Sequence, residues 1–505
     1  MYKKQLLRVS PESVGFDSKS LKEMLQRLET CGTEMHGFML ARHGKVVSEC
    51  WWSPYHKDLV HICHSFGKSY VAAAVGLACT EGLLSVDDKM TDLFRDEIIE
   101  YGIPMSENLK KLTVEHVLTM SNGMSVESEN DADLVRNYLS CAVEKEPGSE
   151  FKYNTSGSCM LGAIVQKVTG KTVLEYLTPR IFEKIGLETD KLGWIRFKNG
   201  IHAAPGVSAS TENNLRLGML YLNGGNWEGE QLIDREWMSR ATSKRIDNDS
   251  GSGHIDGRSG YGYQLWMCRE PGVYRFDGGH GQFSVMSTRE NIVIAIHQSA
   301  SMPGDTGAVM DILHEYILSR NLPDTLPDDA ASLADLRHFE ASRSLPLPEK
   351  SPVPDDYNDW NGIYRITEGS FHIHPELRPG GAANVYVPFY KNDDFWAKTI
   401  SVYFRTPESC ELVIDGVYTL DVRMDGTIFP VYTGSAIPEY YLTYSSGYFE
   451  QDGTLVIDTR YFQTCFKTRL VLKKERGGLR IEVRKETLHD NNPYYYYNAF
   501  ADRIV

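Results

Sequence analysis

The sequence lacks the features that would place it at a membrane or on nucleic acid. It contains no run approaching 18 apolar residues, the length that a membrane-spanning helix needs. It also contains no block of Lys and Arg, and a formal net charge of -15 disfavours binding to polyphosphate, which depends on the release of counterions by basic side chains. We therefore expect neither nucleic acid nor a membrane among its partners.

Signs of export and of metal binding are missing as well. Residues 1–10 hold only two leucines before Arg8, too few for the apolar core of a secretory signal. The nine cysteines include no C-x-x-C pair, which indicates reduced thiols and a cytoplasmic protein. No H-E-x-x-H occurs, and His372-Ile-His374 is followed by Pro375-Glu376 rather than by an aspartate. We expect no metal and no cofactor.

What is present is an ordinary globular composition with an α+β pattern. The 505 residues are 41% hydrophobic, enough for two to four structural units. Helical and strand-like segments from both ends of residues 1–325 predict one antiparallel sheet flanked by helices, with a helical region inserted at about 69–250. The expected helices are 17–31 and 304–320, and the expected strands are a hairpin over 37–50, then 262–267, 283–286 and 292–297.

A proline-rich stretch divides the chain. Residues 344–354 contain four prolines, which favours an extended spacer. Beyond it, strand-like runs alternate with Asp-Gly and Gly-Gly turns, the pattern of an antiparallel barrel or sandwich. The tyrosines at 494–497 either line a ligand surface or occupy half-exposed strands, and the second interpretation is favoured. The predicted division is a catalytic domain at 1–340, a linker at 341–356 and a β-barrel-like domain at 357–505.

One motif points to nucleophilic chemistry. Ser65 and Lys68 open an apolar run that stops at Gly82. Three residues apart on a helix, their side chains lie on one face, and the helix N-terminus favours negative charge. The motif is weak by itself, because Ser149 and Lys152 have the same spacing in a predicted loop after Pro147-Gly148. Two further segments give it context: Tyr153 precedes the helical run 160–170, and Asp277-Gly-Gly-His280-Gly281 enters a strand.

In this order, these segments resemble the serine hydrolases of the β-lactamase and penicillin-binding protein superfamily. The resemblance is to the class C β-lactamase-like branch, which includes esterases, D-aminopeptidases and aminohexanoate-oligomer hydrolases. It covers about residues 10–325 and implies a β-lactamase/transpeptidase-like catalytic domain with a helical subdomain. Besides the motifs above, it rests on Arg42–Lys45, Glu81–Lys89, Leu118–Met124, Pro147–Gly170, Ser208–Glu212 and Gly260–Gln264.

The resemblance implies a role for each matching residue. Ser65 is expected to be the nucleophile, Lys68 its base or proton relay, and Tyr153 a second acid or base. A serine hydroxyl needs such help because it is a poor nucleophile until a neighbour takes its proton. The backbone N–H of Ser65 and one from the strand after His280, of Phe283 or else Gln282, are expected to form the oxyanion hole.

Two departures from the family pattern bear on the substrate. Thr155 stands where the third residue of a Y-x-N motif is usually Asn, and we expect it to tune substrate contacts. His280-Gly281-Gln282 replaces K-T-G, and a partly protonated imidazole holds a carboxylate less reliably than lysine does. Both changes argue against efficient β-lactam hydrolysis.

We therefore expect a serine hydrolase that cleaves a small ester or amide through an acyl-Ser65 intermediate. The alternatives are a β-lactamase or D-amino-acid-specific peptidase, an idle binding module with a penicillin-recognition fold, and an interaction protein built around the C-terminal barrel. Relatives often append a lipocalin-like barrel. Here it would supply a loop that closes the active-site cleft, mediate homo-oligomerisation, or only stabilise the chain, and the sequence leaves these roles open.

Overall fold

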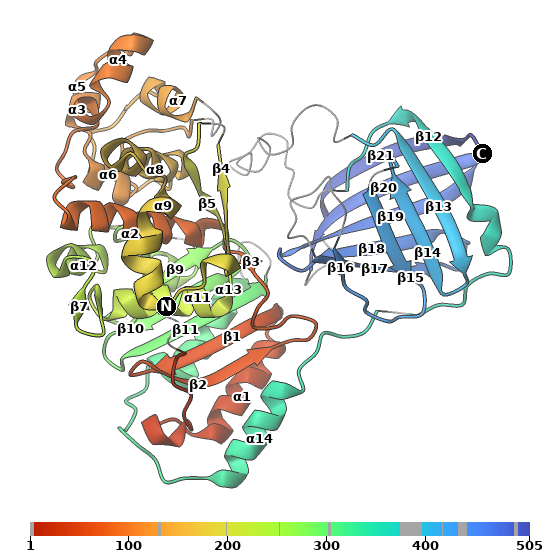
Figure 1. Cartoon of the computed structure of the whole chain (residues 1–505), viewed down its shortest axis with the longest axis horizontal. Coiled ribbons are helices and arrows are strands. Elements are labelled where there is room, and N and C mark those ends of the chain that lie inside the picture. Colours follow the sequence, from red (N-terminus) through yellow and green to blue (C-terminus); the bar gives the residue numbers. More distant parts are fainter. Residues whose placement is uncertain are drawn as a thin grey trace.

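The chain folds into a mixed helix-and-sheet body and a β-barrel, joined by an extended connection (Figure 1). The structure is a computed structural model, which describes residues 5–128, 133–197, 199–251, 253–300, 305–348, 350–373, 396–416, 418–432, 442–488 and 493–505. Within these ranges, no helix combines the length and the apolar character that crossing a bilayer requires. All nine cysteines lie within the described residues, and none of them forms a disulfide.

The first body is built on a six-stranded antiparallel sheet. The N-terminal hairpin joins strands from residues 266–299, with Phe38 paired to Ile296. The predicted sheet, made from both ends of the domain, is therefore confirmed. In spatial order the strands are β2 (Lys45–Trp51), β1 (Glu34–Arg42), β11 (Ile292–Ser299), β10 (Gln282–Ser287), β9 (Val273–Gly278) and β8 (Trp266–Met267).

Strand β9 was not among the expected strands, and its sequence explains why. Arg275 and Asp277 interrupt its apolar run, so the sequence does not predict a buried strand there. In the fold, Arg275 Nε donates to Asp277 Oδ2 at 2.7 Å, and this ion pair satisfies both charges inside the structure.

Helices cover both faces of the sheet. One face carries α1 (Ser18–Glu29), α13 (Asp305–Leu313) and α14 (Ala330–Ala341). The other carries α11 (Thr211–Leu222). Helix α2 (Gly67–Thr80) is bonded to α11, because the Tyr221 hydroxyl donates to the carbonyl oxygen of Ser69, and α8 (Thr155–Thr169) packs on α2. The remaining helices are α3 (Met90–Leu93), α4 (Arg95–Tyr101), α5 (Glu107–Lys111), α6 (Val114–Leu118), α7 (Leu134–Ser140), α9 (Val173–Leu177), α10 (Glu183–Ile185) and α12 (Arg235–Ala241), and the small strands are β3 (His61–Ile62), β4 (Leu192–Arg196), β5 (His202–Ala209), β6 (Asn226–Trp227) and β7 (Glu230–Gln231).

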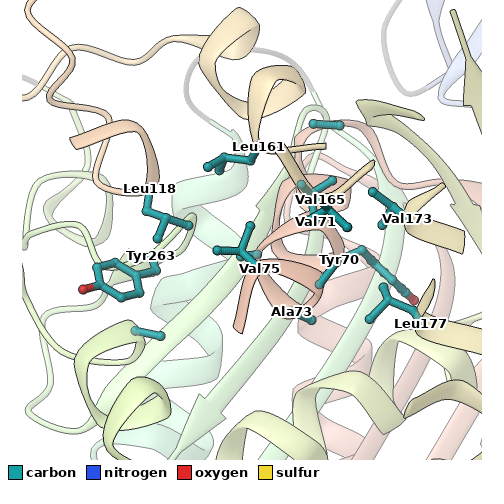
Figure 2. Packing of buried hydrophobic residues seen from close by; sticks show 14 of the residues in the cluster. Tyr70, Val71, Ala73, Val75, Leu118, Leu161, Val165, Val173, Leu177 and Tyr263 are labelled. Atoms are coloured by element: carbon teal, nitrogen blue, oxygen red, sulfur yellow. The ribbon is translucent and has the colours of Figure 1, made fainter. Parts of the chain in front are cut away.

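Helix α2 is buried on every side, which is typical of a helix at the centre of a domain. Figure 2 shows Val71 and Val75 of this helix packed among Leu118, Leu161 and Val165. Because each fully buried Val or Leu contributes roughly 2 kcal/mol, this packing holds the helix firmly. Residues just before α2 are therefore carried on a rigid support.

The second body is a closed barrel, in agreement with the predicted all-β domain. Among the described residues, ten strands run in the order β15-β14-β13-β12-β21-β20-β19-β18-β17-β16. A parallel pairing of β15 with β17 closes the ring and leaves β16 outside it. The strands are β12 (Gly362–Gly369), β13 (Thr399–Thr406), β14 (Ser409–Ile414), β15 (Tyr418–Arg423), β16 (Val431–Tyr432), β17 (Leu442–Phe449), β18 (Leu455–Tyr461), β19 (Phe466–Glu475), β20 (Gly478–Thr487) and β21 (Pro493–Arg503).

Most buried side chains of the barrel are apolar, and alternate residues such as Leu470 and Leu472 fill its interior, but Lys485 and His372 are buried as well, with Lys485 Nζ 3.4 Å from His372 Nδ1. The strand expected at 384–387 and His374 lie outside the described residues. We keep the division into 1–340, 341–356 and 357–505 as a proposal, because α14 ends at Ala341 and the first barrel strand begins at Gly362.

Candidate active site

The candidate nucleophile stands on a clamped segment immediately before α2. Strand β3 leads into a 3-10 helix, η2 (His64–Phe66), and His64 adopts a left-handed conformation with φ of 50°. Glycines allow the chain to fit here: a Cβ on Gly67 would lie 2.2 Å from the carbonyl oxygen of Ala204, and one on Gly278 would lie 2.0 Å from that of Cys63. The segment is thus wedged between β5 and the end of β9.

Ser65 and Lys68 meet as the motif predicts. Lys68 Nζ lies 2.8 Å from Ser65 Oγ, within hydrogen-bonding distance. Lys68 is only 1% exposed, so its amine is surrounded by protein rather than by water, whereas Ser65 is half-buried. A hydroxyl and an amine in this arrangement can exchange a proton.

Tyr153 completes a cluster with this pair. Lys68 Nζ lies 4.9 Å from the centroid of the Tyr153 ring. The ring stacks on Trp266 of β8, with centroids 5.9 Å apart and planes 21° apart. Sequence reasoning did not single out Trp266, because a tryptophan in a short strand gives no sign that it supports a distant tyrosine.

The residues after Tyr153 start helix α8. Asn154 is its N-cap, and its Oδ1 accepts from the N–H of Gly157 at 2.6 Å. Thr155 is the first helical residue, and its backbone N–H donates to Glu127 Oε1 at 2.8 Å. The asparagine of this motif therefore caps the helix, one position before the place where the Y-x-N pattern puts it.

His280 lies in the connection between β9 and β10, also with a left-handed backbone, φ 62°. Its Nδ1–H donates to the carbonyl oxygen of Ala300 at 2.9 Å. Its ring lies 5.5 Å from that of His64, centroid to centroid. The structure thus brings His280 next to the residue that precedes Ser65.

Gln282 and Phe283 are placed differently from His280. The amide of Gln282 is buried and donates to the carbonyl oxygen of Gln298 at 2.7 Å. Phe283 is paired with Asp277 on one side and Ile296 on the other, so its backbone lies within the sheet. Its ring packs on the sheet face opposite α2. The structure does not bring the Phe283 side chain to the Ser65 cluster.

An acidic group adds to the electrostatics of the cluster. Burial raises the pKa of Asp277, while the positive charges of Arg275 and, more weakly, of Lys68 oppose that rise. Burial also raises the pKa of Tyr261 well above its usual value, and Tyr153 and Asp277 add to this rise. Asp277 therefore lies close enough to the cluster to influence its charge, a role that sequence reasoning did not assign to it.

In the part of the chain that the structure describes, no three His, Cys, Asp or Glu side chains are grouped so as to hold a metal ion. His372 contacts the barrel instead, with Nε2 at 2.9 Å from the Tyr497 hydroxyl.

A contribution from the barrel was not expected at any particular residue. Cys465 and Phe466 reach the catalytic domain, where the Phe466 ring lies 4.9 Å from that of His280. No local sequence signal marks them, because the contact joins residues about 400 positions from Ser65.

Comparisons with known proteins show the family of the chain. A family model described as Beta-lactamase matches residues 25–315. The 6-aminohexanoate-dimer hydrolase of Paenarthrobacter ureafaciens is 23% identical over 293 residues, which cover 54% of this chain and 74% of that protein.

Two solved structures are similar to the chain at low identity. A penicillin-binding protein homologue from Caulobacter crescentus is 16% identical, with a TM-score of 0.48 over 62% of this chain and 100% of that one. An octameric penicillin-binding protein homologue from Pyrococcus abyssi is also 16% identical, with a TM-score of 0.46 over 95% of this chain and 99% of that one.

Proposed function

The chain belongs to the beta-lactamase family, and on that premise we propose that it is a serine hydrolase that cleaves a small ester or amide through an acyl-Ser65 intermediate. The observation that carries the proposal is the 2.8 Å contact between Ser65 Oγ and the buried amine of Lys68. The relative named as a 6-aminohexanoate-dimer hydrolase supports hydrolysis of an amide or a related acyl bond.

In the proposed reaction, the Ser65 hydroxyl loses its proton to the Lys68 amine while Oγ bonds to the substrate carbonyl carbon. Collapse of the tetrahedral intermediate breaks the bond to the alcohol or amine, which leaves with a proton relayed by Lys68 and Tyr153. Water then attacks the acyl-serine, releases the acid and returns the proton to Ser65.

The developing negative charge on the substrate oxygen requires two hydrogen-bond donors. We assign one to the backbone N–H of Ser65, at the start of η2. For the second, the N–H of Gly279 is better placed than that of Gln282 or Phe283, because Gly278 lies directly against the backbone of Cys63. One such donor is worth on the order of 3 kcal/mol.

The departures at Thr155 and His280 favour an ester or simple amide over a β-lactam. His280 is held by Ala300 and lies against His64, so a substrate carboxylate would not meet the flexible cation that a lysine offers. A β-lactamase or a D-amino-acid-specific peptidase is the second candidate within the class, and penicillins and cephalosporins test it directly.

The first experiment is intact-protein mass spectrometry after exposure to a fluorophosphonate serine probe. We expect one adduct on the wild-type protein and none on Ser65→Ala. No adduct on either protein would overturn the proposal in favour of an idle binding module. Turnover of a p-nitrophenyl ester panel that disappears in Ser65→Ala then separates a hydrolase from a protein that is acylated only once.

A further inference from the structure

The turn between β18 and β19 of the barrel is inserted into the catalytic domain. We call residues Phe462–Phe466 the docking turn. All five are at most 4% exposed. The backbone N–H of Ile62 donates to the carbonyl oxygen of Gln463 at 2.7 Å, and Ser299 Oγ donates to that of Cys465 at 3.0 Å. The docking turn is therefore bonded both to β3, just before the nucleophile, and to the central sheet.

The end of the docking turn packs on the two histidines beside Ser65. The Phe466 ring meets His64 edge-on at 5.9 Å and His280 edge-on at 4.9 Å, centroid to centroid. Cys465 Sγ accepts from Gln282 Nε2 at 3.2 Å, and it donates to the carbonyl oxygen of Gln298 at 3.4 Å. One short piece of the barrel thus touches both sides of the candidate active site.

A second, polar connection leads from the barrel to the same segment. Arg460 of β18 forms an ion pair with Glu34, whose other partner is His36 at 3.1 Å. His36 Nδ1 in turn lies 3.0 Å from His61 Nε2. Burial alone would raise the pKa of Glu34, but Arg460 and His36 lower it to about 2. The chain of contacts ends at His61, four residues before Ser65.

We propose that the docking turn is a positioning element of the active site, which holds the segment His61–Ser65 and His280 in the geometry needed for acyl transfer. The proposal rests on the proposed function. His64 keeps a left-handed backbone, a conformation that persists only where its surroundings enforce it. Gly67 and Gly278 fix the segment from within the catalytic domain, and the docking turn adds contacts from the barrel.

The test compares two buried phenylalanines of the barrel. Phe466 is 4% exposed and touches both histidines, whereas Phe449 is 8% exposed and packs on Trp360 within the barrel core. Phe466→Ala and Phe449→Ala each remove one buried ring and leave a cavity of similar size. Because misplacement by about 1 Å can cost 10²-fold, we expect Phe466→Ala to lower kcat and the fluorophosphonate labelling rate by about 10- to 100-fold with little change in KM.

Phe449→Ala should lower the melting temperature and leave the labelling rate of the folded protein unchanged. Phe466→Leu, which keeps an apolar side chain, should recover part of the lost rate. A second readout does not depend on activity: hydrogen–deuterium exchange of a peptide covering residues 60–66. Exchange should be faster in Phe466→Ala, because the Ile62 N–H bond to Gln463 loosens, and unchanged in Phe449→Ala.

Equal loss of rate in the two alanine variants, or unchanged exchange at 60–66 in Phe466→Ala, would overturn the proposal. If Phe466→Ala does not fold, Cys465→Ala, which removes a single sulfur atom, replaces it in the same comparison. A wild-type protein that resists the probe defeats the proposed function instead, and in that case the exchange measurement still decides whether the docking turn holds the segment.

Discussion

Two segments of this chain carry a serine and a lysine three residues apart, and they have different structures. Lys68 is buried at the start of α2 and its amine meets Ser65 Oγ at 2.8 Å. Ser149 and Lys152 are exposed in a loop, where Lys152 Nζ donates to the backbone carbonyl of Ser125 instead. The same two residue types at the same spacing thus form a candidate catalytic pair in one segment and part of a surface loop in the other.

The difference lies in what surrounds each pair. A helix places residues three apart on one face, whereas the loop does not. Burial deprives Lys68 of water, so its amine needs a partner at the site, whereas Lys152 is exposed and donates to a backbone carbonyl of the loop. The chemistry of the motif therefore comes from the helix and from burial, and not from the spacing alone.

The largest expected effect is the difference between replacing Ser65 and replacing Ser149. Ser65→Ala should reduce turnover on the order of 10⁴-fold or more and abolish fluorophosphonate labelling, because no other nucleophile is in place. Ser149→Ala, which changes the same residue type at the same spacing, should leave both unchanged. Steady-state kinetics on a p-nitrophenyl ester and intact-protein mass measure the difference between the two variants. Equal activity of Ser65→Ala and Ser149→Ala would contradict the prediction.

The two lysines give the next contrast. Lys68→Arg should lower kcat by about 10²- to 10⁴-fold, because arginine does not give up its proton and cannot act as the base. Lys152→Arg keeps an exposed positive charge and should behave like the wild type. Wild-type turnover in Lys68→Arg would exclude the proposed role of Lys68.

Tyr153 sharpens the comparison, because it follows Lys152 in the sequence but lies beside Lys68 in the fold. Removing its hydroxyl in Tyr153→Phe should lower kcat by about 10²-fold, because the proposed proton relay to the leaving group loses one member. Tyr138→Phe is a matched control, because the Tyr138 hydroxyl accepts from Asn122 at 3.2 Å elsewhere in the domain. Wild-type turnover in Tyr153→Phe, measured by steady-state kinetics, would argue against the relay.

The smallest expected effect is a loss of folding stability below neutral pH, caused by buried titratable groups in the six-stranded sheet. Burial, with a smaller contribution from His36, lowers the pKa of His297 to about 3. The unfolded chain takes up this proton near pH 6.5, so the free energy of unfolding should fall as the pH drops from 6.5 towards 3. Glu34, whose pKa is about 2, should add a loss below pH 4.5.

Urea unfolding at pH 7, 6, 5 and 4 measures this loss. His297→Gln removes one of the titrating groups and should reduce the slope of the curve between pH 6.5 and 5, whereas His61 and His202, whose pKa values burial also lowers, should keep part of it. A wild-type curve that is flat over the same interval would show that His297 is not held in its neutral form.

Much of the fold could be predicted from local pattern. The helix at Ser18–Glu29 and the hairpin of β1 and β2 follow from apolar spacing and from the turn at His43-Gly44. Strand β9 could not be recognised, because Arg275 and Asp277 satisfy each other only after folding. The approach of Ser65 and Lys68 was predictable, since both lie within one helical turn.

Positions that depend on the sheet were harder to predict. Gln282 and Phe283 follow His280 in the sequence and looked equivalent as backbone donors. In the fold they lie in β10, an inner strand, and Phe283 is paired with a residue of β9 on one side and of β11 on the other. We propose Gly279 as the donor because the fold packs the neighbouring Gly278 directly against the backbone of Cys63.

The sequence by itself determined the order of the motifs, the helical segment that brings Ser65 and Lys68 together, and the division between an α+β body and a barrel. These features depend on residues close together in the chain. Only the tertiary structure decided that the docking turn of the barrel contacts His64 and His280. That contact depends on how two domains pack, and packing is set by the shape of whole surfaces rather than by any short pattern of residues.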